Sequence, residues 1–319
     1  MIDSLIFSVG GIDGLTYIGC LRALEECDEL ENVSTIIGCS SGSIISCLIV
    51  LGYKSNEIEN IISEIDFGKI ININIDDFVN IDEDLGLENG EKLSKLISLF
   101  IYHKTGKKDL TFQELYDLTK KKLVIGSVCF DTEALEYFEY EKSPDMSISL
   151  AMRMSCSIPI LFTPVSYNDK LYVDGGILGR YPINNKYLKN TNCCIGFKII
   201  HDVCKSYTIS NLSFGEYIHY IFGIMFNKAQ LFENKNNENI TTVEIKPCRN
   251  TYCGVNFEIT NEEKKRLVEI GYSETRKSII KLRLSSYQKL DYFENIISEC
   301  LIKKKAVQKS IAKYDIHIK

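Results

Sequence analysis

The sequence lacks the features that would place it in a membrane, outside the cell or around a metal. No run approaches the roughly eighteen apolar residues that a membrane-spanning helix needs, and the N-terminus, MIDSLIFSVGG, has no basic leader. The 12 cysteines include no C-x-x-C pair and fall at apolar positions. We therefore expect a soluble cytoplasmic protein with reduced, buried cysteines, no disulfide framework and no bound metal.

The sequence also lacks a complete nucleotide-binding motif, although it begins with a glycine loop. The apolar strand Ser4 to Val9 runs into Gly10-Gly11-Ile12-Asp13-Gly14, and apolar residues then recur at helical spacing. Val9 stands where G-x-G-x-x-G has its first glycine, and no Gly-Lys-Ser follows. Backbone amides in such a loop form an anion-binding nest, which either cradles a phosphate or stabilises an oxyanion.

A serine between two glycines is the central feature of the sequence. The β-branched run Val33 to Ile37 leads into Gly38-Cys39-Ser40-Ser41-Gly42, and the apolar segment Ser43 to Leu51 follows. This G-x-S-x-G spacing is typical of a sharp strand-to-helix turn, in which a Cβ at either glycine would clash with backbone. Ser40 then has a strained conformation at a helix N-terminus. Taken alone, the pattern indicates either a nucleophile or plain close packing.

The order of these units predicts how they meet. Residues 4–24 and 33–51 each read as strand, loop and helix, so their strands are expected to be parallel neighbours joined by a right-handed crossover. Both loops then emerge at the same edge of the sheet. With 319 residues, 45% of them hydrophobic, the chain can bury a full core around such a sheet.

The rest of the chain continues the alternation of helices and strands. Apolar periodicity predicts helices over 90–102, 111–119, 146–154, 214–232, 261–284 and 292–313, and strands over 123–130, 136–140, 170–173, 192–200 and 242–245. Residues 56–90 give no clear period and are interpreted as a surface loop, with an extended segment over the site left open. The Asp174-Gly175-Gly176 sequence indicates either a hairpin turn or a carboxylate placed at the sheet edge.

Four motifs in this order resemble those of the patatin-like phospholipases, over about residues 4 to 200. They are Gly10-Gly11, Gly38 to Gly42, Ser155-Cys156-Ser157-Ile158-Pro159 and Asp174-Gly175-Gly176. The resemblance implies an α/β fold, a three-layer α/β/α sandwich with a mostly parallel sheet and a helical C-terminal extension. It places the catalytic domain at residues 1–205 and a mainly helical part, packed on the same domain, at 206–319.

The resemblance also implies phospholipase A-type hydrolysis of fatty-acyl esters by a Ser-Asp dyad, without a cofactor or metal. In this sequence Ser40 corresponds to the nucleophile and Asp174 to the base. The amides of Gly10, Gly11 and Ile12 correspond to the oxyanion hole, and the supporting glycines are Gly14, Gly38, Gly42, Gly175 and Gly176. The expected partner is a phospholipid or other acyl-ester lipid at a membrane surface, with no nucleic acid. The basic stretch 262–319, with fourteen Lys and Arg against eight Asp and Glu, suggests peripheral membrane association.

Two positions depart from the family pattern. Val9 replaces the first glycine of the loop, and Asp13 replaces a basic residue. A carboxylate beside a developing oxyanion raises its energy, unless Asp13 points into solvent or caps the helix. The departures therefore keep open a catalytically weak or inactive lipid-binding or regulatory protein. The α/β-hydrolases also use G-x-S-x-G but need a histidine after the acid, for which the sequence offers only His201, His219 and His317.

Overall fold

A mostly parallel sheet lies at the centre of the structure, a computed structural model that describes residues 2–70, 85–183, 186–188, 191–200, 221, 239–247 and 257–284. Within these residues its strands have the order β10-β9-β1-β2-β4-β8-β7, and β5 pairs with β4. The parallel strands are β1 (Ser4–Phe7), β2 (Thr35–Cys39), β4 (Lys122–Cys129), β9 (Cys194–Ile199) and β10 (Ile240–Ile245). The antiparallel strands are β5 (Ala134–Phe138), β7 (Val165–Tyr167) and β8 (Lys170–Asp174).

Both faces of this sheet are buried, which explains why its strands read as continuous apolar runs. On one face, Phe7 packs against Tyr17 at 5.1 Å and against Phe197 at 4.9 Å between ring centroids. The other face is a cluster made of Ile6, Ile37, Val124, Cys194, Tyr181 and Leu188.

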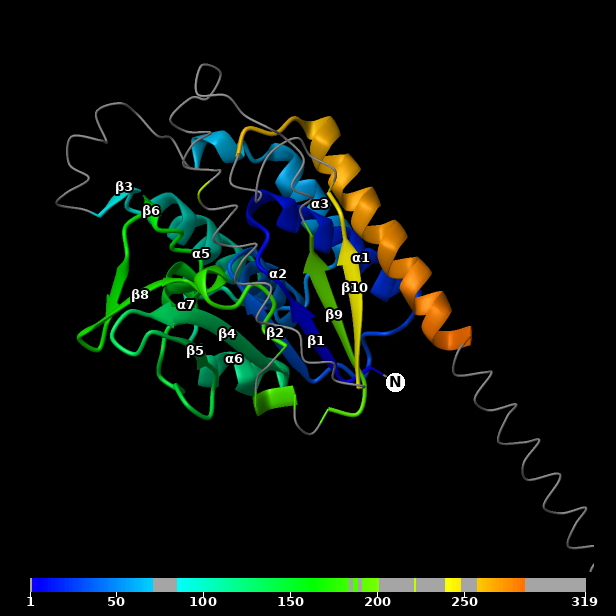
Figure 1. Cartoon of the computed structure of the whole chain (residues 1–319), viewed down its shortest axis with the longest axis horizontal. Coiled ribbons are helices and arrows are strands. Elements are labelled where there is room, and N and C mark those ends of the chain that lie inside the picture. Colours follow the sequence, from blue (N-terminus) through cyan, green and yellow to red (C-terminus); the bar gives the residue numbers. More distant parts are fainter. Residues whose placement is uncertain are drawn as a thin grey trace, which may run out of the picture. The chain divides into compact units, whose positions relative to one another are not determined.

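Helices flank the sheet (Figure 1). The α-helices are α1 (Thr16–Glu26), α2 (Ser41–Val50), α3 (Ser55–Glu64), α5 (Glu91–Thr105), α6 (Phe112–Thr119) and α7 (Ile148–Ser155), and residues 261–284 are also helical. Short 3-10 helices are η1 (Gly11–Leu15), η2 (Phe67–Lys69), η4 (Gly175–Ile177) and η5 (Lys186–Leu188). Helices α2 and α7 pack on β4, and α1 packs on α3. A separate two-stranded sheet joins β3 (Gly86–Glu88) to β6 (Ile160–Phe162).

The predicted α/β fold class is confirmed, and the first two strands are parallel neighbours as expected. The surface-loop prediction is wrong for the beginning of 56–90, because α3 occupies Ser55–Glu64. Its apolar residues Ile58 and Ile62 have helical spacing and are buried, and Glu57 accepts the Lys54 N–H at 2.8 Å. The expected helices over 214–232 and 292–313 lie outside the described residues, apart from the helical residue 221, and so does the stretch 71–84.

The chain divides into two compact units, residues 1–275 and 276–319. All the strands and the numbered helices belong to the first unit. In the second unit, residues 276–284 are helical. The division at residue 205 that the sequence suggested stays a prediction. Within the described part of the chain, no helix is long and apolar enough to cross a membrane.

Candidate active site

Ser40 lies where β2 ends and α2 begins. Its φ of 53° and ψ of −128° are unusual for a residue with a side chain, and the side chain is buried. Such a conformation costs about 1–3 kcal/mol and persists only where the surroundings hold it. The Ser40 carbonyl accepts the Ser43 N–H at 2.8 Å and the Ser43 hydroxyl at 2.6 Å, which starts α2. The predicted strand-turn-helix setting of Ser40 is confirmed.

The glycines around Ser40 are needed because other atoms approach them closely. A Cβ on Gly38 would lie 2.2 Å from the Gly42 carbonyl oxygen, and one on Gly42 would lie 2.4 Å from the Phe7 carbonyl oxygen. A Cβ on Gly14 would lie 2.6 Å from the Ser41 hydroxyl oxygen. The steric reason expected for G-x-S-x-G is therefore correct, and Gly14 lets the glycine loop approach the serine turn.

Asp174 ends β8 and is 1% exposed. Its Oδ1 accepts the Gly176 N–H at 2.7 Å, whereas its Oδ2 has no hydrogen bond of normal geometry among the described residues. Burial raises the pKa of Asp174 to about 6, and the nearby Ser40 hydroxyl and Gly176 N–H oppose this rise. A Cβ on Gly175 would lie 2.9 Å from the Gly126 carbonyl oxygen, so the turn after Asp174 has no room for a side chain. A buried carboxylate with a free oxygen beside Ser40 can accept a proton from that serine.

The glycine loop forms η1, whose first residue, Gly11, has a φ of 53°. The first N–H groups of a helix have no partner inside it, so those of Gly11 and Ile12 are suited to bind an anion. The N–H of Val9 is different, because it donates to the Arg180 carbonyl oxygen at 2.8 Å. An oxyanion hole at this loop would therefore use amides after Val9.

Asp13 is completely buried, at 0% exposure, so an orientation into solvent is wrong. It is not the N-cap either, since Gly10 occupies that position and Asp13 lies in the first turn of η1. Its neighbours Ile12 and Gly14 line the cavity beside Ser40, but Asp13 does not. Asp13 is therefore buried outside the cavity lining and does not occupy the space beside Ser40.

Ser155, at the end of α7, connects the serine turn to the sheet. The Ser40 N–H donates to the Ser155 hydroxyl at 2.8 Å, and that hydroxyl donates to the Gly126 carbonyl oxygen at 2.6 Å. Sequence reasoning gave Ser155 only a place in a family motif and no role. Since Ser40 and Ser155 are 115 positions apart, no local pattern could reveal this contact.

A buried arginine, Arg153, bonds Ser157, which in turn bonds the backbone of Asp174. No role was assigned to Arg153 from the sequence. Its guanidinium donates to the Ser157 hydroxyl and to the carbonyl oxygens of Asn89 and Thr163, the latter two at 2.8 and 3.0 Å. The Ser157 carbonyl in turn accepts the Asp174 N–H at 2.8 Å. Arg153 is 6% exposed, and the five donors of a guanidinium suit it to joining several carbonyl groups.

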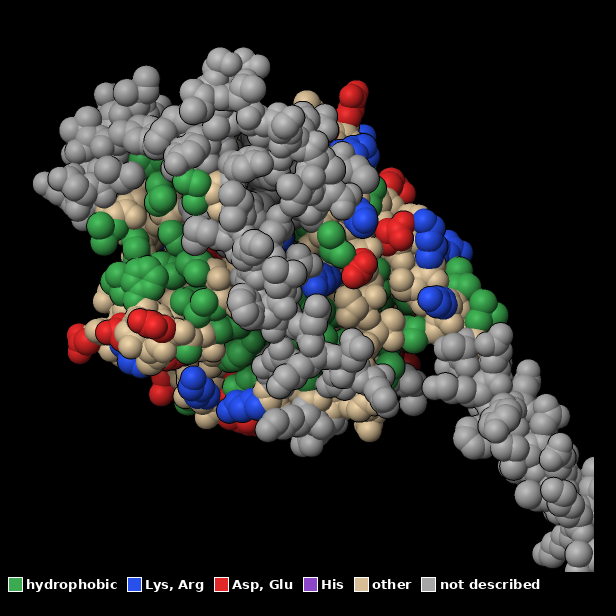
Figure 2. Space-filling model, viewed as in Figure 1, with side chains coloured by type: hydrophobic (Ala, Val, Ile, Leu, Met, Phe, Trp, Pro, Cys, Tyr) green, Lys and Arg blue, Asp and Glu red, His purple; other side chains and the backbone are tan. Residues whose placement is uncertain are grey.

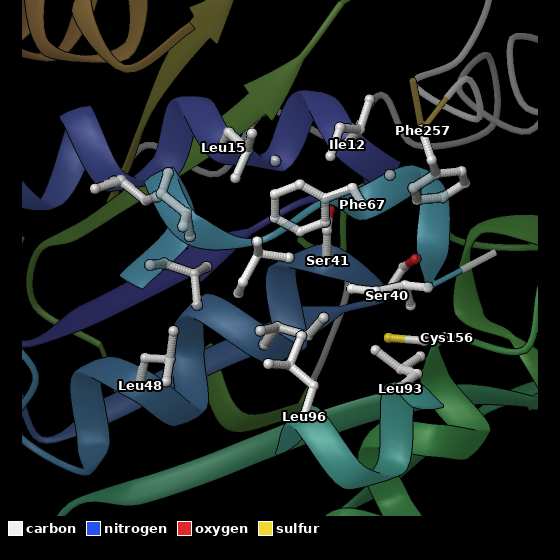
Figure 3. A pocket seen from close by; sticks show the side chains of 18 of the residues that line it. Ile12, Leu15, Ser40, Ser41, Leu48, Phe67, Leu93, Leu96, Cys156 and Phe257 are labelled. Carbon is white, nitrogen blue, oxygen red and sulfur yellow. The ribbon is translucent and has the colours of Figure 1, made fainter. Parts of the chain in front are cut away.

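Ser40 lies at one end of an apolar cavity with a volume of about 140 Å³ (Figure 3). Cys156 and Phe257 lie near the same end, and Leu48 lies at the other. The cavity is lined by Gly11, Ile12, Gly14, Leu15, Ile18, Ser40, Ser41, Ile44, Ile45, Leu48, Ile58, Ile62, Ile65, Phe67, Ile70, Leu93, Leu96, Phe100, Cys156, Ile158, Phe162 and Phe257.

The described cysteines are free thiols, and six of these eight are buried. Burial raises the pKa of Cys156 to about 12, with a further contribution from Asp174, so this thiol beside Ser40 is neutral at physiological pH. In the described ranges, no three His, Cys, Asp or Glu side chains lie together as a metal site would require.

A serine in a strained turn, a buried carboxylate and an amide-rich loop around an apolar cavity are the parts of a serine-dependent ester hydrolase. A family model described as Patatin-like phospholipase matches residues 5–185, more than half of the chain. The chain belongs to the patatin-like phospholipase family.

The chain is also similar to individual proteins. The chain is 33% identical over 183 residues to the probable lipid hydrolase 463L of Invertebrate iridescent virus 6, a match that covers 57% of this chain and 62% of that protein. It is 28% identical over 286 residues to the uncharacterized protein R571 of Acanthamoeba polyphaga mimivirus, a match that covers 88% of this chain and 95% of that protein. The crystal structure of VipD from Legionella pneumophila shares the fold, with a TM-score of 0.59, 16% identity and coverage of 88% of this chain and 67% of that one.

Proposed function

We propose that this protein is a phospholipase A-type lipid acyl hydrolase in which Ser40 is the nucleophile and Asp174 the base. The observation that supports this most strongly is the pairing of the two residues. Asp174 is buried, its Oδ2 has no hydrogen bond of normal geometry within the described part of the chain, and the nearby Ser40 hydroxyl lowers its pKa. Family membership and the name of the viral relative support a lipid ester as substrate.

In this mechanism Ser40 Oγ attacks the ester carbonyl carbon while Asp174 takes the hydroxyl proton. The tetrahedral intermediate collapses to an acyl-serine as Asp174 protonates the departing alcohol, which is a lysophospholipid when the substrate is a phospholipid. A water molecule then attacks the acyl-serine with Asp174 again as base, and Asp174 returns the proton to Ser40 Oγ as the fatty acid leaves. A carboxylate of pKa about 6 is a better base than an ordinary aspartate and is still mostly ionised at neutral pH.

The oxyanion of each intermediate is assigned to the amides of Gly10, Gly11 and Ile12. Each donor aimed at such a charge typically contributes about 3 kcal/mol to transition-state stabilisation. The main reason for expecting a weak or inactive site was the charge of Asp13, and that side chain does not line the cavity. Because Asp13 does not line the cavity, the space beside Ser40 stays open to a substrate, which favours an active enzyme over a lipid-binding protein with an inactive site.

Delivery of substrate from a membrane surface is supported by two exposed apolar side chains. Ile160 follows the Ser155–Pro159 segment and is 37% exposed, and Leu178 follows Asp174 and is 47% exposed. On the face shown in Figure 2, hydrophobic side chains of the described residues gather around β6 and β8, and charged side chains lie toward the rim. Apolar side chains beside a lipid-binding site are suited to enter the headgroup region of a bilayer.

The test is the hydrolysis of phospholipid vesicles, with the products identified by mass spectrometry. The wild type should release fatty acid and lysophospholipid, and both Ser40→Ala and Asp174→Asn should abolish this release while the fold is retained. Turnover that survives in Asp174→Asn would remove Asp174 from the mechanism. Binding of vesicles by the wild type without any product would instead favour a lipid-binding role.

A further inference from the structure

One face of α2 runs along the cavity away from Ser40. Ser41, Ile44, Ile45 and Leu48 line it, and their i, i+3, i+4, i+7 spacing places them on one side of the helix. Beyond Ser40 and Ser41, every lining side chain among the described residues is apolar. The cavity thus offers a hydrocarbon environment along α2 and polar groups only at the serine end.

At the Leu48 end, the cavity is lined by buried side chains from three helices. Leu48 and Ile45 from α2 are each 4% exposed, and Ile18 from α1 is 3% exposed. Ile58 and Ile62 from α3 are 1% and 7% exposed. Two aromatic residues of the lining, Phe67 and Phe257, are half-buried. A chain that enters from Ser40 therefore meets buried side chains from three helices at the Leu48 end.

Helix geometry gives the distance along α2 between its first and last lining residues. Ser41 and Leu48 are seven positions apart, and at a rise of about 1.5 Å per residue they are about 10 Å apart along the helix. With bonds of about 1.5 Å and angles near 111°, an extended hydrocarbon chain advances roughly 1.25 Å per carbon, so about eight carbons fill this span. We propose that the cavity is a channel that limits the length of the bound acyl chain and selects medium-chain acyl groups of about eight to ten carbons, because Leu48 blocks longer chains.

This inference rests on the proposed function, since it takes Ser40 as the point where the acyl carbonyl is held. Each methylene that leaves water for the channel should raise kcat/KM about fourfold. The gain should stop once the chain reaches Leu48, because further carbons find no space. Activity on soluble p-nitrophenyl esters should therefore rise steeply up to about eight to ten carbons and then level off or fall.

Variants of α2 test the role of Leu48 directly. Leu48→Ala leaves a cavity at the Leu48 end and should move the preferred chain length up by about two carbons. Ile45→Phe should move the preferred length down. Ile49→Ala is the matched control, because Ile49 is the next residue, is 5% exposed and does not line the channel. If either alanine variant fails to fold, the pair Leu48→Val and Ile49→Val makes the same comparison with a smaller change.

The measurement separates failure of this inference from failure of the proposed function. Hydrolysis that requires Ser40 but has the same chain-length profile in wild type, Leu48→Ala and Ile45→Phe would overturn the channel and leave the hydrolase intact. If no ester is hydrolysed, displacement of a fluorescent fatty acid from Ser40→Ala by acids of six to sixteen carbons tests the channel without turnover. Affinity that levels off near eight to ten carbons supports it, and affinity that rises steadily to sixteen carbons overturns it.

Discussion

The backbone N–H of Ser40 donates to the hydroxyl of Ser155 over 2.8 Å, so the end of α7 holds the strained turn at the end of β2. Ser155 must accept this bond and donate to the Gly126 carbonyl oxygen at the same time. Only a hydroxyl can serve both partners in this space. Ser155 is therefore a positioning residue for the nucleophile, without itself reaching the substrate.

Replacing Ser155 by alanine should reduce kcat about tenfold to a hundredfold and change KM little. The variant leaves the Ser40 N–H and the Gly126 carbonyl oxygen buried without partners, at about 1–3 kcal/mol each. Steady-state kinetics on a soluble ester gives both constants. Ser149→Ala on the same helix is the control, because the buried Ser149 hydroxyl has no hydrogen-bond partner among the described residues. Equal losses in both variants would mean that α7 tolerates no substitution and that the Ser155 bond has no special role.

The pH dependence of hydrolysis should reflect Asp174. The carboxyl can act as a base only when ionised, and burial raises its pKa to about 6. We expect kcat/KM to fall as the pH decreases through about 6 and to reach a plateau above about 7. A profile recorded from pH 4.5 to 8.5 checks this. A midpoint near 4 would mean that another carboxyl or a solvated Asp174 is the base.

The raised pKa of Asp174 also predicts that its ionisation lowers the stability of the fold, although the same ionisation is needed for activity. Because the folded-state pKa of Asp174 is raised above its unfolded value, the folded chain binds more protons between about pH 4 and 6, and this group lowers the free energy of unfolding as the pH rises through that window. The ionised carboxylate then costs on the order of 3 kcal/mol at neutral pH. Asp174→Asn should accordingly be inactive but no less stable than wild type in urea at pH 7.5. A clear loss of stability would show that the charge contributes favourably to the fold.

Gly90 and Gly106 allow a clean test of the Arg153 network. Both have positive φ, 76° and 72°, and they flank α5. A Cβ on Gly90 would lie 1.9 Å from Arg153 Nε, whereas one on Gly106 would meet nothing within 4 Å. Gly106→Ala should cost only about 1 kcal/mol of backbone strain, and Gly90→Ala should cost at least 2 kcal/mol more because Arg153 is displaced. Thermal unfolding of both variants measures the difference, and equal losses would argue against a fixed Arg153.

Leu178 should matter on membranes and not in solution. Replacing it by serine should reduce hydrolysis of phospholipid vesicles several-fold while leaving turnover of a short soluble ester unchanged. Leu118→Ser is the control, since Leu118 is 63% exposed on α6, which precedes the opposite end of β4. The ratio of vesicle to ester activity is the measured quantity. An unchanged ratio in Leu178→Ser would remove this residue from the membrane contact.

The sequence predicts the framework of the site well because that framework depends on local rules. The glycines around Ser40 reflect steric contacts within one turn, and the apolar runs reflect strands buried on both faces. A resemblance to a family was needed to select Asp174, because Asp-Gly-Gly alone indicates a hairpin equally well.

What the sequence could not show depends on contacts between distant segments. Asp13 is buried in the first turn of η1, whereas its residue type alone suggested exposure to solvent or a helix cap. The bond from Ser40 to Ser155 and the reach of Arg153 to Asn89 join parts of the chain that only the fold brings together. The helix α3 was missed because its polar residues obscure a short apolar stripe.

Labelling with a fluorophosphonate, read by intact mass, tests the central claim most directly. The probe reacts with an activated serine, so wild type should gain one adduct, Ser149→Ala should gain the same adduct, and Asp174→Asn should react far more slowly. Ser40→Ala should gain none. An adduct that persists in Ser40→Ala, or a wild type that remains unlabelled, would contradict the assignment of Ser40 as the nucleophile.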